Sequence, residues 1–212
     1  MKQRIEYIDL AKVICILLVI VDQIIKILVK TNMCLGESIR IFDWFRITFV
    51  ENNGMAFGMA FGGKVGKLCL TLFRLVLFGV LCWWISSLAK KESTPTGVLV
   101  GLTLITAGAF GNIVDCVCYG QIFSASPMDF SGNADPAVFG GSYAPLFFGR
   151  VVDMFYFPLI DTYWPDWMPF VGGRPLKFFE PVFNFADSCV TVGAFYLILF
   201  QYKFFTKDEK KS

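Results

Sequence analysis

The chain has no histidine among its 212 residues. Without imidazole it can hold no Ser-His-Asp triad, no Cys-His catalytic pair and no HExxH zinc helix. Charge is also scarce: Lys, Arg, Asp and Glu make up 17% of the residues, and the formal net charge is +2. No basic stripe with interleaved aromatic residues is present, so we expect no nucleic-acid partner. Acid–base chemistry in this chain therefore points first to paired aspartates.

Cysteine offers no alternative chemistry. The seven cysteines are an odd number, and their only close pair, Cys116-x-Cys118, has the wrong spacing for a zinc knuckle. Five of the seven lie within or beside apolar runs, as expected of small hydrophobic residues in helices. We therefore expect no metal site and no cofactor.

The abundant feature is apolar sequence. Hydrophobic residues make up 56% of the chain and the mean hydropathy is +0.61, which is typical of a multi-span membrane protein. Four runs approach the ~20 residues that cross a bilayer, at about 10–29, 68–88, 96–119 and 185–205. The pattern predicts one mainly α membrane domain over 1–212. Its expected form is a four-transmembrane-helix bundle with a small extracytoplasmic β-containing subdomain.

Lysine and arginine orient these spans. Basic residues gather near the N-terminus, in the short connection at 90–91 and near the C-terminus, and such segments stay in the cytoplasm. Both termini are then inside, and segments 30–67 and 120–184 are extracytoplasmic. We expect a β-strand at 39–50, irregular chain at 120–150, and no long helix in the proline-rich segment 158–181.

Charged side chains inside the predicted spans should meet at one level. At a rise of ~1.5 Å per residue, all of them fall in the outer half of the membrane. A carboxylate in the second outer segment, Asp153, should share that face. The intramembrane residues are Asp22, Lys26, Arg74, Asp115 and Asp187.

Helical spacing groups several polar residues into pairs. They are Asp22 with Lys26, Asn112 with Asp115, and Asn184 with Asp187. Each pair also has a purely structural interpretation. The first could be a salt bridge that lowers the insertion cost, the second an interhelical hydrogen bond, and Asp187 a carboxylate at a helix N-terminus. Asp153 could be a solvated loop acid.

Five short blocks now stand in order along the chain. They are Asp22-Gln23-x-x-Lys26, Asn52-x-Gly54-x-Ala56-Phe57, Gly111-Asn112-x-x-Asp115, Val152-Asp153 and Phe183-Asn184-x-Ala186-Asp187. With these blocks the chain resembles the lipoprotein signal peptidases (type II signal peptidases) of bacterial inner membranes. The resemblance implies an aspartyl endopeptidase whose catalytic pair is Asp153 and Asp187. The supporting residues that it implies are Asp22, Lys26, Asn52, Gly54, Asn112, Asp115, Asn184 and Ala186.

The resemblance also implies a substrate and a location. The substrate would be a prolipoprotein that carries a diacylglyceryl-modified cysteine, cut just before that cysteine. Globomycin-like cyclic peptides would inhibit the enzyme. It would lie in the bacterial cytoplasmic (inner) membrane, in contact with lipid, with its active site at the outer face. Nothing in the sequence demands a partner subunit, so we expect a monomer.

Two features depart from that family's pattern. Cys116 stands where the family usually has arginine, so the interaction of that guanidinium is absent or supplied by Arg150 or Arg74. The connection before Val152 is extended by much of 121–150.

Two other functions remain open from sequence. One is a small proton- or ion-coupled transporter subunit with Asp22, Lys26 and Asp115 along its path. The other is a non-catalytic membrane scaffold.

Overall fold

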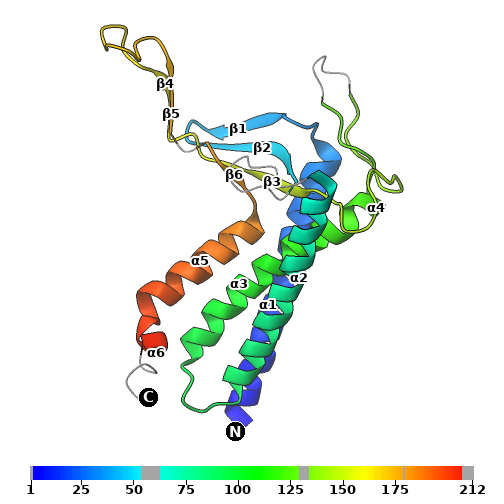
Figure 1. Ribbon diagram of the computed structural model, residues 1–212, viewed down its shortest axis with the longest axis vertical. Coiled ribbons are helices and arrows are strands. Elements are labelled where there is room, and N and C mark those ends of the chain that lie inside the picture. Colours follow the sequence, from blue (N-terminus) through cyan, green and yellow to red (C-terminus); the bar gives the residue numbers. More distant parts are fainter. Residues whose placement is uncertain (1, 54–62, 129–133, 179, 207–212) are drawn as a thin grey trace.

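The computed structural model describes residues 2–53, 63–128, 134–178 and 180–206. A helical bundle stands below a small β-sheet, and a long β-hairpin projects from that sheet (Figure 1). Three motif residues, Gly54, Ala56 and Phe57, lie outside the described residues.

The main helices cover the four apolar runs. Two of them, α2 and the continuous helix 96–122, are long and apolar enough to cross a membrane, and α5 is a shorter apolar helix. The predicted run 185–205 is not one helix, because the chain leaves helical geometry at Gln201. The helices are α1 (Lys2–Asn32), α2 (Gly63–Ala89), α3 (Thr96–Val114), α4 (Gly120–Ile122), α5 (Phe185–Phe200) and α6 (Tyr202–Thr206), with a π-helical turn η1 (Asp115–Tyr119) between α3 and α4.

Helix α3 is the centre of the bundle, since α1, α2 and α5 all pack against it. Small residues allow α3 and α5 to come close, as is usual between membrane helices. A Cβ atom at Gly108 would lie 2.2 Å from the backbone oxygen of Ala186. One at Gly193 would lie 2.8 Å from the backbone oxygen of Gly101. The start of α5 is thereby held against the far end of α3.

The sheet has the strand order β1-β2-β3-β6 and is antiparallel throughout. The single strand predicted at 39–50 is wrong. The chain turns at Asp43 and Trp44, and Phe42 pairs with Phe45 across a two-residue loop. The continuous run of β-forming residues hid this turn. The strands are β1 (Ser38–Phe42), β2 (Phe45–Asn52), β3 (Val151–Tyr156) and β6 (Val182–Phe183).

The remaining outer chain divides into two parts. Strands β4 (Ile160–Tyr163) and β5 (Pro175–Phe178) form the projecting hairpin, so the described part of 158–181 contains no long helix, as predicted. The described part of segment 120–150 is largely irregular, also as predicted. Its residue Phe123 joins Tyr119 at the end of η1 and Phe49 of β2 in a buried core under the sheet.

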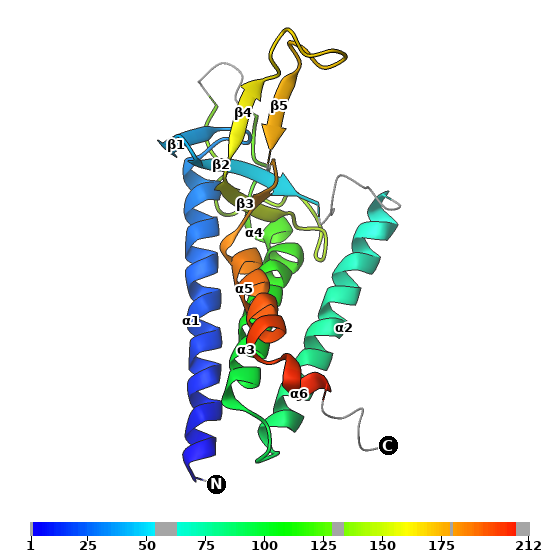
Figure 2. The ribbon, with the colours of Figure 1, turned by 90° about the vertical axis from the view of Figure 1, so that its left-hand side faces the viewer.

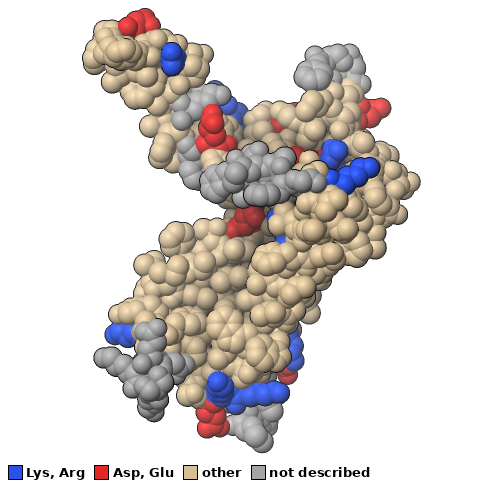
Figure 3. Space-filling view, in the orientation of Figure 1, with Lys and Arg blue, Asp and Glu red and all other residues tan. Residues whose placement is uncertain are grey.

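Both ends of the chain lie on one side of the molecule. The first turns of α1 and the short helix α6 are at the end of the bundle opposite the sheet (Figures 1 and 2). Charged side chains gather near the sheet and near that opposite end, with an almost uncharged band between them (Figure 3). In the hollow below the sheet, acidic and basic atoms are visible (Figure 3).

Candidate active site

Asp153 lies in β3, within the sheet, and not in a solvated loop. It is 3% exposed and stands opposite Val50 of β2. Its Oδ1 atom accepts a hydrogen bond of 2.6 Å from the Nδ2 atom of Asn184. Burial, with the charge of Asp187 nearby, raises the pKa of Asp153 to about 7. A carboxyl group in this environment can carry a proton near neutral pH.

Asp187 is the third residue of α5 and half-buried. Asn184 is the N-cap, and its side-chain oxygen accepts a 2.9 Å hydrogen bond from the backbone nitrogen of Asp187. The Asp187 Oδ2 atom in turn accepts from the Asn184 backbone nitrogen at 3.4 Å, which completes a capping box. Asp187 is therefore a carboxylate at a helix N-terminus, as its purely structural interpretation from sequence proposed. It also contacts the side chain of Asn112.

Two asparagine side chains connect these carboxylates. The Nδ2 atom of Asn184 donates to Asp153 and, at 3.1 Å, to the Oδ1 atom of Asn112. The Nδ2 atom of Asn112 donates to the Oδ1 atom of Asp187 at 2.8 Å. A continuous chain of hydrogen bonds therefore joins β3, the start of α5 and α3. It fixes the two carboxylates on opposite sides of the amide pair.

Lys26 of α1 binds to this chain of hydrogen bonds at Asn112. Its ammonium has no exposed surface and contacts three oxygens, which is its full capacity as a donor. They are Asp22 Oδ2 at 2.9 Å, Asp115 Oδ2 at 2.8 Å and Asn112 Oδ1 at 2.8 Å. The salt bridge that was one interpretation of Asp22 and Lys26 is present, and it is part of a larger network.

Asp22 and Asp115 each hold a backbone that carries one aspartate of the pair. The Oδ1 atom of Asp22 accepts from the backbone nitrogen of Ala186 at 2.9 Å. The Oδ2 atom of Asp115 accepts from the backbone nitrogen of Val152 at 3.2 Å. Ala186 is buried at this point, and a larger side chain there would meet α3 at Gly111. These residues act by placing their neighbours Asp187 and Asp153.

Gln23 and Tyr119 complete the network, and neither is among the predicted site residues. The Nε2 atom of Gln23 lies within hydrogen-bond distance of Asp22, Asp115 and the backbone oxygen of Gly111. The Tyr119 hydroxyl donates to the Oε1 atom of Gln23 at 3.0 Å. Gln23 could have been found from sequence, because it lies inside the block Asp22-Gln23-x-x-Lys26. Nothing in the sequence near Tyr119 links it to Gln23, 96 residues away.

Asn52 lies at the end of β2, paired with Val151, and its side chain hydrogen-bonds to Asp153.

The guanidinium that reaches Cys116 comes from α2: the Nη1 atom of Arg74 donates to the Cys116 Sγ atom at 3.2 Å. Of the two arginines considered from sequence, Arg74 is thus the one beside Cys116. Arg150 instead bonds the Oε2 atom of Glu51 at 2.9 Å.

Glu51 forms a second buried network just behind Asn52. Its side chain is 2% exposed and forms ion pairs with Lys30 of α1 and with Arg150. Ser126 donates to the same carboxylate at 2.8 Å. The ring of Tyr143 lies against both cations, 4.9 Å from the Lys30 Nζ atom. Residues of the 121–150 extension are thereby fastened to β2.

No metal site accompanies these networks. Among the described residues, no group of three or more His, Cys, Asp or Glu side chains could hold a metal ion. The acidic residues of the candidate site are instead occupied by Lys26, by amides and by backbone nitrogens.

The sequence and the fold of this chain are similar to those of known proteins. The model of the signal peptidase (SPase) II family matches residues 14–203. A lipoprotein signal peptidase of Porphyromonas gingivalis is 49% identical over 184 residues, which cover 87% of this chain and 79% of the relative. One of Amoebophilus asiaticus is 33% identical, covering 88% of this chain and 75% of that protein.

A solved bacterial membrane enzyme has the same fold, with a TM-score of 0.58 and 23% identity, covering 97% of this chain and 94% of that one. A second such structure has the same TM-score and identity, with coverages of 91% and 92%. The family match extends over every described block of the candidate site. The chain therefore belongs to the signal peptidase II family, the aspartyl proteases that remove signal peptides from prolipoproteins.

Proposed function

We propose that Asp153 and Asp187 are the catalytic pair of this peptidase, and that it cuts prolipoproteins just before a diacylglyceryl-modified cysteine. The observation that carries the proposal is the hydrogen-bond chain Asp153–Asn184–Asn112–Asp187. It brings together two carboxylates from segments 34 residues apart, in a chain without histidine.

The environments of the two carboxylates assign their starting roles. Asp153 is the more buried, and with its pKa raised to about 7 it remains partly protonated at neutral pH. Asp187 lies less buried at the start of α5, and both of its carboxyl oxygens accept hydrogen bonds, from the side chain of Asn112 and from the backbone nitrogen of Asn184. Asp187 then acts as general base and Asp153 as general acid, although the pair titrates as a unit.

Hydrolysis follows from these roles. Asp187 takes a proton from a water molecule, whose oxygen attacks the scissile carbonyl carbon. Asp153 donates its proton to the carbonyl oxygen, which gives a neutral tetrahedral intermediate. Collapse of that intermediate breaks the C–N bond, and the proton on Asp187 goes to the leaving amine. As the C=O bond re-forms, the proton of one hydroxyl of the intermediate returns to Asp153, so both groups recover their starting states.

The other predicted site residues have positioning roles in this scheme. Asn112 and Asn184 hold the two carboxylates apart in fixed orientations. Lys26 with Asp22 and Asp115 fixes Asn112 and the backbones of Ala186 and Val152. Such preorganisation means that the polar groups need not rearrange during the reaction.

We also propose that the chain forms one membrane domain with four spans. Helix α1 carries charge, yet Asp22 and Lys26 are 1% and 0% exposed, so these charges would not face lipid. The uncharged band of Figure 3 supports the same placement. The distribution of Lys and Arg puts both termini in the cytoplasm and the sheet outside. The catalytic pair then lies near the outer face, where a lipid-anchored cysteine would lie.

Two finer features belong to the proposal. A monomer suffices, because both aspartates and their supporting network come from a single chain. Globomycin-like cyclic peptides should compete with the substrate at this pair. Family membership does not support the transporter alternative, and Lys26 is fully engaged with Asp22, Asp115 and Asn112, so it is not placed along an open path.

Cleavage of a defined prolipoprotein tests the proposal. Purified protein in lipid vesicles should cut a diacylglyceryl-modified prolipoprotein, and mass spectrometry should find the modified cysteine at the new N-terminus. Globomycin should stop the cut, and the unmodified precursor should stay intact. Asp187→Asn should cleave at least about 10²-fold more slowly, whereas Asp43→Asn, on an exposed turn, should cleave normally. Near-normal cleavage by Asp187→Asn, or a cut elsewhere in the precursor, would overturn the proposal.

A further inference from the structure

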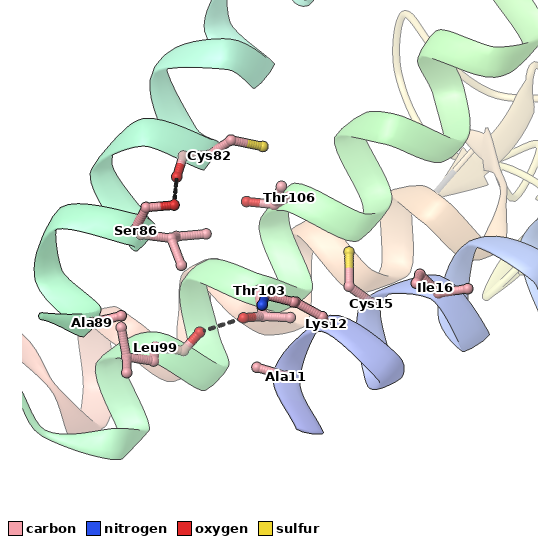
Figure 4. Close-up of a pocket in the computed structure, with 11 residues that line it drawn as sticks. Ala11, Lys12, Cys15, Ile16, Cys82, Ser86, Ala89, Leu99, Thr103 and Thr106 are labelled. Carbon is pink, nitrogen blue, oxygen red and sulfur yellow. Dashed lines mark hydrogen bonds between the residues drawn. The ribbon is translucent and has the colours of Figure 1, made fainter. Parts of the chain in front are cut away.

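A cavity of about 340 Å³ lies between α1, α2 and α3, at the end of the bundle opposite the sheet. Its wall includes Cys15 of α1, Cys82 and Ile85 of α2, and Leu99 and Thr106 of α3 (Figure 4). The volume falls in the range of ~300–1,000 Å³ that is usual for small-molecule sites. It is separate from the network that supports the aspartate pair, because Cys15 and Asp22 are about 10 Å apart along α1 at ~1.5 Å per residue.

The arrangement of the helices explains the space. Helices α1 and α2 both pack on α3, and the cavity lies in the angle between them. Only 6% of the apolar stretch of α2 is buried, and its other residues are half-buried or exposed. The exposed lining residues Ile16 and Ser86 mark the side on which the cavity opens.

Away from Lys12, the hydroxyl groups of the wall offer no donor to a polar ligand. The hydroxyl of Thr103 donates to the backbone oxygen of Leu99 at 2.7 Å. The hydroxyls of Thr106 and Ser86 donate in the same way, to carbonyls four residues back in their own helices. The thiols of Cys15 and Cys82 behave as small apolar groups. The wall therefore suits an apolar occupant.

We propose that this cavity binds an acyl chain of a phospholipid from the surrounding bilayer. The inference goes beyond the peptidase function and rests on the membrane placement proposed above. With that placement the mouth of the cavity faces hydrocarbon, and acyl chains are the abundant apolar ligand there. An acyl chain bound between α1 and α2 would fill the space that the side chains of these helices leave empty.

Charge at the end of the cavity nearest the start of α1 suits a phosphate headgroup. Lys12 lines the cavity, and Lys90 and Lys91 directly follow the lining residue Ala89. Asp9, which pairs with Lys12 at 2.8 Å, and Glu92 offset part of this charge. Long lysine side chains can extend along apolar surface and place the ammonium at headgroup level. A phospholipid would thus place its chain in the cavity and its phosphate beside these lysines.

The two wall cysteines permit a test in the unmodified protein. We would compare maleimide alkylation of Cys15 and Cys82 in lipid-depleted detergent and after addition of phosphatidylglycerol, mapped by mass spectrometry. At a lipid concentration of ten times Kd, an occupied cavity slows alkylation about tenfold. Cys69 is the matched control, because it lies exposed on the same helix α2 and should change little. Equal slowing at all three cysteines would overturn the proposal.

Photo-crosslinking identifies the occupant directly. A phosphatidylglycerol with a diazirine in its acyl chain should label the cavity wall, and excess unlabelled lipid should compete. Labelling of the exposed α5 face around Ile198 should not saturate, since that face meets bulk lipid. Cys15→Trp should remove the saturable labelling while prolipoprotein cleavage continues. Labelling that does not saturate, or that prolipoprotein displaces and phospholipid does not, would contradict the proposal.

Discussion

At the residue scale, the chemistry of the site depends on unequal surroundings for two carboxyl groups. Asp153 is buried in the sheet beside the amide of Asn184, whereas Asp187 is half-buried at the start of α5. Burial and the neighbouring Asp187 raise the pKa of Asp153 to about 7. One group can therefore hold a proton while the other accepts one, which is the requirement for acid–base hydrolysis without imidazole.

The raised pKa gives cleavage a defined pH dependence. Protonated Asp153 is required in our scheme, so kcat should fall as the pH rises through about 7. The free energy of unfolding should change with pH in the same direction as kcat. The folded state binds this proton at pH values where the unfolded chain does not, so stability falls between pH ~4 and ~7.

Asp153→Asn provides the control, since it removes that titration. Thermal unfolding of the variant should therefore vary less with pH than that of the wild type between these limits. A wild-type kcat that rises steadily from pH 6 to pH 9 would contradict the assignment of Asp153 as the acid.

Cys116 should matter little despite its place beside Asp115. It accepts a hydrogen bond from Arg74, but sulfur is a weak acceptor. We expect Cys116→Ala to retain prolipoprotein cleavage within about threefold, equivalent to less than ~1 kcal/mol. Cys118→Ala serves as the neighbouring control. A loss of a hundredfold or more in Cys116→Ala alone would show that the thiol has a role in the reaction.

At the scale of elements, the close approach of α3 and α5 sets the position of Asp187. Gly108→Ala would place a methyl group 2.2 Å from the Ala186 backbone oxygen, so α5 must move away from α3. Overpacking of this kind costs ~1–3 kcal/mol, and it should lower kcat strongly because Ala186 adjoins Asp187. Gly79→Ala in α2 has open space around it and should remain as active and as stable as the wild type. Equal activity of the two variants would show that this contact does not position the site.

The Glu51 network should fix the 121–150 extension to the sheet. Glu51→Gln leaves Lys30 buried with a neutral partner, and breaking a buried ion pair costs ~3–5 kcal/mol. We expect a lower unfolding temperature and faster proteolysis within 121–150. Asp43→Asn, which breaks an exposed ion pair with Arg40, should change neither measurement appreciably. Unchanged proteolysis in Glu51→Gln would mean that other contacts hold the extension.

Local sequence predicted some elements well and others poorly. The apolar runs located the helices, and the spacing of Asp22 and Lys26 placed them on one helix face, where they form a salt bridge. The hairpin turn at Asp43 was missed, because the residues around it all favour strands. The Glu51 network was also missed, since its partners Lys30 and Arg150 come from segments far apart in sequence. Contacts of that kind follow from packing and have no local signature.

At the scale of the whole molecule, a charged network lies between a helical bundle and a sheet. The positions of the intramembrane charges predicted that they would share one level. The structure joins Asp22, Lys26, Asp115 and Asp187 through one set of hydrogen bonds, with Arg74 next to it at Cys116. Depth along the helices was enough to infer this meeting, whereas the detailed pairing required the fold.

The central claim is that two aspartates from separate segments perform the hydrolysis together. The most direct test is single-turnover cleavage of a diacylglyceryl-modified prolipoprotein by Asp153→Asn and Asp187→Asn, each shown to be folded and inserted in vesicles. Each substitution should lower the rate by about 10²–10⁴-fold. The double variant should be little worse than either single variant, because the two groups act as a unit. Near-normal cleavage by either single variant would contradict the account.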